Sequence, residues 1–218
     1  MLLGCFGYIM GGTGIEEAMA VVYAENTVPH MMSGAAVNRA IRAHDMNAVA
    51  LYSILLNDAI STEDKEDLKD CIQSILKGET CLRTLASCHA LKKVSSVICQ
   101  KQETKVENKT ACLWFVYLDM LSLLRRFLRA TGLGYWNAHI STLEEMMPYF
   151  AACGHNNYLK SVWLYLQNMM ELKESNPSVY SKFQNGYFTI RRTDKKVYGE
   201  LPCDLVIEQT LMRPLKSR

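Results

Sequence analysis

Apolar side chains recur every three or four residues through most of this 218-residue chain, and that spacing limits the possible folds more than any other feature. Because an α-helix has 3.6 residues per turn, this period is typical of helices that bury one side. The clearest run follows residue 113 and contains Trp114, Tyr117, Leu118, Leu121, Leu124 and Leu128. The pattern predicts a mainly α-helical, bundle-like domain.

Polar residues, prolines and glycines mark where these helices begin and end. Residues 61–64 (Ser-Thr-Glu-Asp) form a helix start, and residues 176–177 place an asparagine N-cap before a proline at the first helical position. Residues 141–144 have the spacing of a capping box, and Pro148 kinks or restarts the helix that they begin. The helices expected from these signals cover residues 15–23, 37–56, 61–76, 81–99, 113–131, 141–153, 156–173 and 176–183.

Three further expectations concern local structure. Residues 187–190 and 197–198 are rich in β-forming side chains and predict at most one small β-hairpin near the C-terminus. Asp204, after Pro202, is placed to cap a last helix. In the helix over residues 37–56 the predicted buried face consists of Val37, Ile41, Met46, Val49 and Tyr52.

The segment over residues 101–109 (KQETKVENK) is the most polar stretch and the best position for a domain boundary. It would separate an N-terminal helical region, residues 1–100, from a C-terminal helical region with the small hairpin, residues 110–218. A single domain over the whole length is the alternative.

The composition excludes several classes of protein. Hydrophobic residues make up 49% and charged residues 21%, which is ordinary for a globular domain and does not indicate disorder. No stretch approaches the roughly 18 to 20 apolar residues that span a membrane, so we expect no membrane partner. The first ten residues lack a positive n-region and predict a buried element rather than a signal sequence. We therefore expect an intracellular protein, nuclear or cytoplasmic, with reduced and mostly buried cysteines.

Cysteine and histidine residues suggest two sites, and both have a simpler structural explanation. Cys81, Cys88 and His89 are the nearest approach to a zinc site, but a fourth ligand and a second close pair are missing, so we expect no bound metal. Cys153 and His155 are a candidate nucleophile and base, which makes His155 a candidate catalytic residue. A buried cysteine and a histidine that caps a helix account for the same two residues.

Asp204 and Glu208 are the candidate metal-binding acids. Four residues apart on a helix, they would share one face, which suits a divalent metal ion or the positioning of a water molecule. The alternative is that Asp204 is the N-cap of that helix and Glu208 a solvated acid of its first turn.

Basic residues form the candidate nucleic-acid-binding surface, provided that the fold brings them together. Tyr135, Trp136 and Tyr187 are near them in the sequence and could stack on bases while the cations hold the backbone. The net charge of +2 does not by itself indicate such a partner, and an ordinary charged surface is the alternative. The basic residues concerned are Arg125, Arg126, Arg129, Arg191, Arg192, Lys195 and Lys196.

Several segments resemble one family almost throughout the chain. They are residues 7–17 (GYIMGGTGIEE), 21–24, 31–36, 148–158 (PYFAACGHNNY), 190–194 and 204–213 (DLVIEQTLMR). The resemblance is to uncharacterised, multi-copy proteins of animal genomes that look derived from mobile elements. Longer members resemble transposases with a ribonuclease-H-like core, in which separated acids bind two metal ions. The resemblance implies that Glu208 is the candidate for the last of these acids and that the chain is a truncated copy.

Together these inferences predict a truncated mobile-element-derived protein without independent catalytic activity, which binds nucleic acid, DNA in particular, or another protein. No cofactor is expected. The alternative is a metal-dependent DNA nuclease or strand-transferase fragment in which Glu208 binds a divalent metal ion. The enzyme would bring Asp204, Glu208, Asp119 and His155 within reach of one metal ion, whereas the binding module would gather the arginines on one open face.

Overall fold

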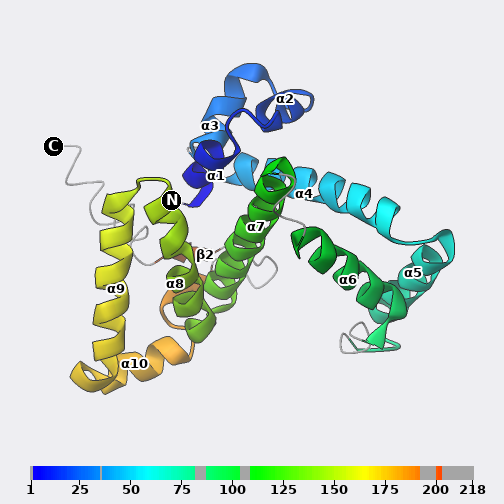
Figure 1. Cartoon of the computed structure of the whole chain (residues 1–218). Coiled ribbons are helices and arrows are strands. Elements are labelled where there is room, and N and C mark those ends of the chain that lie inside the picture. The colour runs from blue at the N-terminus through cyan, green and yellow to red at the C-terminus, as the bar shows by residue number, and fades with distance from the viewer. Residues whose placement is uncertain (1, 35, 82–86, 104–108, 192–199, 203–218) are drawn as a thin grey trace. The chain divides into compact units, whose positions relative to one another are not determined.

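The computed structural model describes residues 2–34, 36–81, 87–103, 109–191 and 200–202. Within them the protein is mainly α-helical (Figure 1), as the periodicity predicts. The helices are α1 (Leu2–Met10), α2 (Ile15–Ala20), α3 (Val28–Met32), α4 (Val37–Ala59), α5 (Thr62–Leu76), α6 (His89–Glu103), α7 (Lys109–Leu133), α8 (Trp136–Ala152), α9 (Asn156–Ser175) and α10 (Pro177–Gln184), with a short 3-10 helix at Glu25–Thr27.

One small antiparallel hairpin follows α10. Its strands are β1 (Thr189–Arg191) and β2 (Glu200–Pro202), with Ile190 opposite Leu201. A single small hairpin near the C-terminus is therefore confirmed, although the first strand begins two residues later than predicted. The predicted second strand at 197–198 lies outside the described residues.

The contacts between Cα atoms divide the chain into two compact units, each with its own core. The first unit comprises the described parts of Met1–Ile9, Met32–Ala35 and Asp119–Arg218, and the second those of Met10–Met31 and Ala36–Leu118. The chain changes unit after residues 9, 31 and 35 and again within α7, between Leu118 and Asp119, whereas the sequence predicts one boundary at 101–109. Of that segment, residues 101–103 belong to α6 and residues 104–108 lie outside the described part of the chain.

The first unit packs α1 with the helices of the C-terminal half. Cys5 and Phe6 on α1 are fully buried, which agrees with the prediction of a buried N-terminal element. The unit's core also contains Met120, Leu121, Leu143, Met146, Phe150, Val162 and Leu166. Phe150 is fully buried, two residues beyond Pro148, which lies inside α8 without ending it.

In the second unit the prediction for the buried face of α4 is wrong. Val37, Met46 and Val49 have exposed fractions of 48%, 48% and 62%. The buried positions are Ala40, Ala43, His44 and Ala48. Small alanine side chains allow α4 to approach its neighbours closely, and this packing overrides the preference of the larger apolar side chains for burial.

His44 is the polar anchor of this core. Its Nδ1 lies 3.0 Å from the hydroxyl of Tyr117 on α7, and that hydroxyl also donates to the His44 carbonyl at 3.3 Å. Both residues are fully buried. Burial lowers the pKa of His44 from its ordinary value of 6.5 to about 4, because a charged imidazolium loses its hydration in the core.

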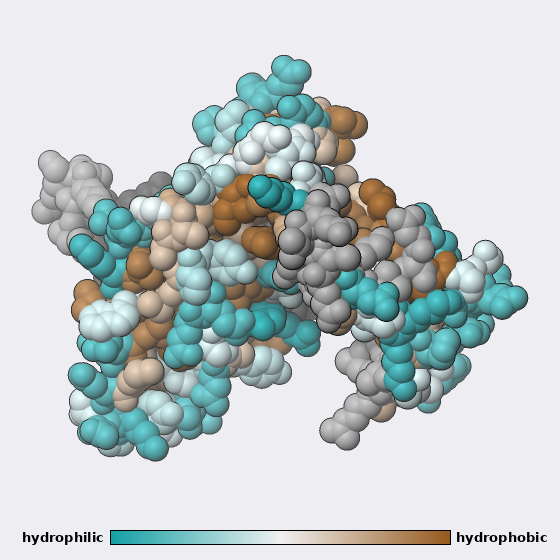
Figure 2. Space-filling view, in the orientation of Figure 1, coloured by the Kyte–Doolittle hydropathy of each residue, from teal (hydrophilic) through white to brown (hydrophobic). Residues whose placement is uncertain are grey.

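The start signal of α5 is confirmed, and the helix ends at Leu76 as expected. Ser61 accepts a hydrogen bond from the backbone N–H of Asp64, and the Asp64 carboxylate accepts one from the backbone N–H of Ser61, which completes a capping box. At the other end Lys77 is the C-cap, and Gly78 adopts a left-handed φ of 76°. Hydrophilic residues dominate the surface around α5 (Figure 2).

The capping box predicted at residues 141–144 is wrong. Helix α8 begins five residues earlier, at Trp136, and the Ser141 hydroxyl donates to the carbonyl of Ala138 at 3.2 Å inside the helix. Gly134, with a φ of 74°, ends α7 and leaves room for α8 to begin at once. The serine therefore lies within a continuous helix, where its hydroxyl bonds to the preceding turn.

Candidate nucleic-acid interface

Two glycines bring the turn between α7 and α8 against the turn after α10. Gly134 and Gly186 have φ angles of 74° and 88°, in the left-handed region that side chains disfavour. A Cβ atom on Gly134 would lie 2.9 Å from the Cα of Gly186, and one on Gly186 would lie 3.1 Å from the carbonyl oxygen of Gly134. The two backbones are in direct contact, with no room for a side chain on either.

An aromatic cluster in the first unit holds these two turns. The ring of Trp136 lies 5.0 Å from that of Phe183 on α10 and 5.2 Å from that of Phe188, measured between centroids. Trp136 is only 4% exposed. The sequence-based suggestion that Trp136 stacks on a base is therefore wrong, because its ring belongs to the core.

His139 lies inside the same cluster. Its ring centroid is 4.9 Å from that of Phe188 and 5.2 Å from that of Phe127. The Thr131 hydroxyl lies 3.2 Å from Nδ1, and the Tyr165 hydroxyl lies 3.5 Å from Nε2. Burial lowers the pKa of His139 from 6.5 to about 4, so the ring is neutral at pH 7.

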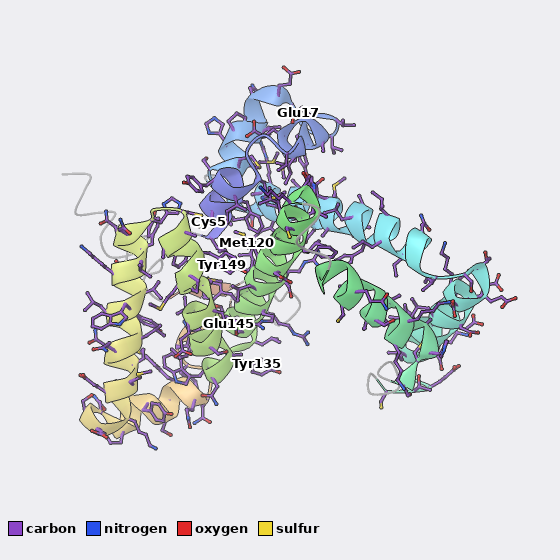
Figure 3. The ribbon with its side chains drawn as sticks, viewed as in Figure 1. Cys5, Glu17, Met120, Tyr135, Glu145 and Tyr149 are labelled. Atoms are coloured by element: carbon purple, nitrogen blue, oxygen red, sulfur yellow. The ribbon has the colours of Figure 1, made fainter. Side chains whose placement is uncertain are left out.

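Two exposed tyrosines flank the contact between the glycines. Tyr135 follows Gly134 and is 57% exposed, at the turn between α7 and α8 (Figure 3). Tyr187 follows Gly186 and is 73% exposed. Since consecutive Cα atoms are about 3.8 Å apart, the glycine contact holds both tyrosine backbones close to one another. Both aromatic side chains are presented to solvent.

One exposed cation lies close to the backbone of Tyr187, and another precedes Tyr135 in the sequence. The backbone N–H of Tyr187 donates to the carbonyl of Lys182 at 3.1 Å, and Lys182 is exposed in the last turn of α10. Arg129 is exposed on α7, six residues before Tyr135. We call Tyr135, Tyr187, Arg129 and Lys182 the tyrosine surface.

The other basic residues of the predicted nucleic-acid-binding surface differ in their burial and in their ion pairs. Arg126 forms an ion pair with Glu145 on α8, so part of its charge is compensated. Arg125 is half-buried on α7, one turn before Arg129. Arg191 ends β1, and Arg192, Lys195 and Lys196 lie outside the described residues. The structure thus places Arg125, Arg126 and Arg129 on one helix and leaves their grouping with Arg192 a prediction.

Cys153 and His155 lie where α8 gives way to α9. Cys153 is the C-cap of α8, and its Sγ lies 4.0 Å from the carbonyl oxygen of Cys5 on α1. Burial, with a smaller contribution from Cys153, raises the pKa of the Cys5 thiol to about 12, so Cys5 is not a thiolate at neutral pH. His155 occupies the N-cap position of α9, but its side chain does not form the capping hydrogen bond.

The candidate acids Asp204 and Glu208 lie outside the described residues, so their role in metal binding stays a prediction. Among residues 2–34, 36–81, 87–103, 109–191 and 200–202, no group of three or more His, Cys, Asp or Glu side chains could hold a metal ion. His89 lies 3.8 Å from the carboxylate of Asp64, with which it can form an ion pair when protonated.

The cysteines are less buried than the sequence predicts. Of the seven that the structure describes, all are thiols, but Cys5 and Cys153 alone are buried. Cys81 and Cys99 are exposed, and the other three are half-buried. Cys203 lies outside the described residues.

A family comparison covers the whole chain. The model of a family described as "Domain of unknown function (DUF8702)" matches residues 1–218. The chain belongs to that family. No curated protein and no solved structure matches it.

In the described part of the DUF8702 protein, no helix is sufficiently long and apolar to span a membrane. Sequence reasoning found Tyr135 and Tyr187 but missed Lys182 and the contact that brings the tyrosines together. Gly134 and Gly186 were visible as turn residues. Their pairing joins positions 52 residues apart, and no local pattern encodes such a contact.

Proposed function

We propose that this DUF8702 protein is a non-catalytic binding module whose tyrosine surface holds single-stranded nucleic acid. The observation that carries the proposal is the pair of solvent-exposed aromatic side chains, Tyr135 and Tyr187, which follow the two glycines whose backbones are in contact, Gly134 and Gly186. Each exposed tyrosine offers a flat aromatic face, and large aromatic side chains contribute strongly to binding when a partner covers them.

Single strands suit this surface better than duplexes. Bases stacked inside a duplex offer no free face, whereas an unpaired base can stack on a tyrosine ring, and each such contact contributes about 1–3 kcal/mol. Stacking depends little on the identity of the base. The proposed binding is therefore tolerant of sequence.

Cations around the tyrosines would hold the phosphates. Arg129 and Lys182 are both exposed. Each phosphate contact releases condensed counterions, with a slope of about −0.7 in log affinity against log salt for single strands. Two such contacts predict a slope between about −1 and −2, a moderate dependence that agrees with the net charge of +2.

We also propose that the protein originates from a mobile element, and the sequence resemblance supports this origin. We further propose an intracellular location, nuclear or cytoplasmic, which suits the thiol state of the described cysteines. No cofactor is part of the proposal. A nuclease or strand-transferase fragment, with a divalent metal ion at Glu208, stays an alternative.

The test is fluorescence anisotropy with a labelled single-stranded oligonucleotide of mixed sequence, in DNA and RNA forms, across a series of salt concentrations. We expect binding that weakens on the order of tenfold in Tyr187→Ala and in Tyr135→Ala, because each loses one stacking platform. Arg129→Gln should weaken binding and make the salt slope shallower by about 0.7.

Matched controls are available on the same chain. Tyr8 is 69% exposed on α1, and Arg39 is exposed on α4. Tyr8→Ala and Arg39→Gln should leave affinity unchanged. Absence of oligonucleotide binding, or equal losses in the Tyr8 and Tyr187 variants, would contradict the proposal. Metal-dependent cleavage of the oligonucleotide that is lost in Glu208→Ala would establish the nuclease alternative instead.

A further inference from the structure

The second unit contains a pocket between α4 and α5. The two helices are joined by Ile60 and Ser61, and the pocket between them has a volume of about 350 Å³. Pockets that hold small molecules range from about 300 to 1,000 Å³, so this one is sized for a small ligand. Along α5 it extends from Lys65 to Gln73, roughly 12 Å at a rise of 1.5 Å per residue.

The lining of the pocket is mainly apolar. Ile60 is 7% exposed at the corner between the helices, and Leu56 on α4 is half-buried. On α5, Leu68 and Ile72 lie one turn apart, and Ile72 remains 42% exposed. These four side chains make up the apolar part of a pocket that is open to solvent.

The charged residues in the lining, within the described part of the chain, are both lysines. Lys65 donates from Nζ to Oδ1 of Asn57 at 2.8 Å, which bridges α5 to α4. Lys69 is exposed one turn further along α5. The acids of the same helix lie outside the lining: Glu63, Asp64, Glu66, Asp67 and Asp70.

The two lysines of α5 line the pocket, and its five acids do not. The positions of Lys65, Leu68, Lys69 and Ile72 are i, i+3, i+4 and i+7, so one face of α5 carries two cations and two apolar side chains together. We propose that the pocket binds a medium-chain fatty acid. Its alkyl chain covers Leu56, Ile60, Leu68 and Ile72, and its carboxylate pairs with the ammonium of Lys69.

The volume and the charges argue for this occupant over a protein helix. A pocket of about 350 Å³ has room for one alkyl chain, whereas a docked helix is a body about 10 Å across. Lysine can also cover apolar surface with its methylene stem while its ammonium stays in water, which suits an amphiphile with an anionic head.

The experiment is isothermal titration calorimetry of the full chain with decanoate below its critical micelle concentration. Decyltrimethylammonium has an alkyl chain of the same length and the opposite charge, and serves as the matched ligand. We expect saturable binding of decanoate and several-fold weaker binding of the cationic amphiphile. Lys69→Glu should weaken decanoate binding several-fold, because an attraction at the mouth becomes a repulsion.

Lys77→Glu makes the same charge change at the end of α5, outside the lining, and should leave decanoate binding unaltered. Lys69→Met, which removes the charge and keeps an unbranched apolar side chain, replaces Lys69→Glu if circular dichroism shows that the glutamate variant has lost helix. No saturable decanoate binding, equal affinity for both amphiphiles, or equal losses in the Lys69 and Lys77 variants would each overturn the proposal.

Discussion

Burial, more than chemical type, decides the protonation state and the accessibility of individual side chains in this protein. His139 is neutral at pH 7 because aromatic rings surround it, and two hydroxyls lie within hydrogen-bonding distance of its ring nitrogens. Tyr135 and Trp136 are neighbours in the sequence, yet one is 57% exposed and the other 4%. The exposed ring is available to a ligand, and the buried ring holds the turn that presents it.

The lowered pKa of His139 predicts a loss of stability in acid. Between pH 6.5 and about 4 the unfolded chain binds a proton that the folded chain excludes, so the free energy of unfolding falls as the pH decreases through this range. The contribution of neutral His139 to the free energy of unfolding is complete above pH 6.5 and amounts to at most about 3 kcal/mol. Urea unfolding of wild type and His139→Phe between pH 4.5 and 7 measures it.

His139→Phe keeps an aromatic ring in the cluster and cannot titrate, so its unfolding free energy should depend less steeply on pH than that of wild type. Some dependence should persist, because His44 also has a pKa lowered to about 4 by burial. Identical slopes for the variant and wild type would show that His139 is not held neutral by the fold.

At the scale of elements, α5 depends on its N-terminal cap. Ser61→Ala removes both the hydroxyl that accepts from the Asp64 backbone and one partner of the Asp64 carboxylate. The expected cost is about 1 kcal/mol in the stability of the helix. Hydrogen exchange of the α5 amides should accelerate in Ser61→Ala. Thr62→Ala, one residue further and outside the cap, should show no such acceleration, and equal exchange in the two variants would refute the role of the cap.

The contact between the turns of α7–α8 and α10 predicts an unequal response of two glycines. Gly154 has a φ of 70° and open space around it, so Gly154→Ala costs about the 1–2 kcal/mol of left-handed strain. Gly134→Ala adds a clash with the backbone of Gly186 to this strain. It should therefore destabilise the protein clearly more than Gly154→Ala does. Chemical denaturation of both variants measures the difference, and equal losses would mean that the two turns are not in contact.

The same elements show how far the sequence predicts this fold. Helix α5 and the start of α10 follow from signals within a few residues, namely the Ser61–Asp64 box and the Asn176 cap before Pro177. The buried face of α4 does not follow from such local signals, because burial depends on what packs against the helix. Likewise, Tyr135 and Tyr187 could be named as candidates from sequence, but their proximity depends on a contact between distant glycines.

The whole molecule has two compact units, and each contains one of the surfaces for which we propose a ligand. The tyrosine surface belongs to the first unit and the pocket between α4 and α5 to the second. A net charge of +2 is too small to attract nucleic acid over long distances, so binding must come from local contacts. The central claim is therefore local: two particular tyrosines stack on unpaired bases.

Photocrosslinking tests that claim most directly. The full chain is bound to a single-stranded oligonucleotide that contains 5-iodouracil, irradiated, digested and analysed by mass spectrometry. We predict crosslinks at Tyr135 and Tyr187. Crosslinks at exposed tyrosines elsewhere, such as Tyr8 and Tyr158, without any at Tyr135 or Tyr187, or no crosslinked product at all, would contradict the account.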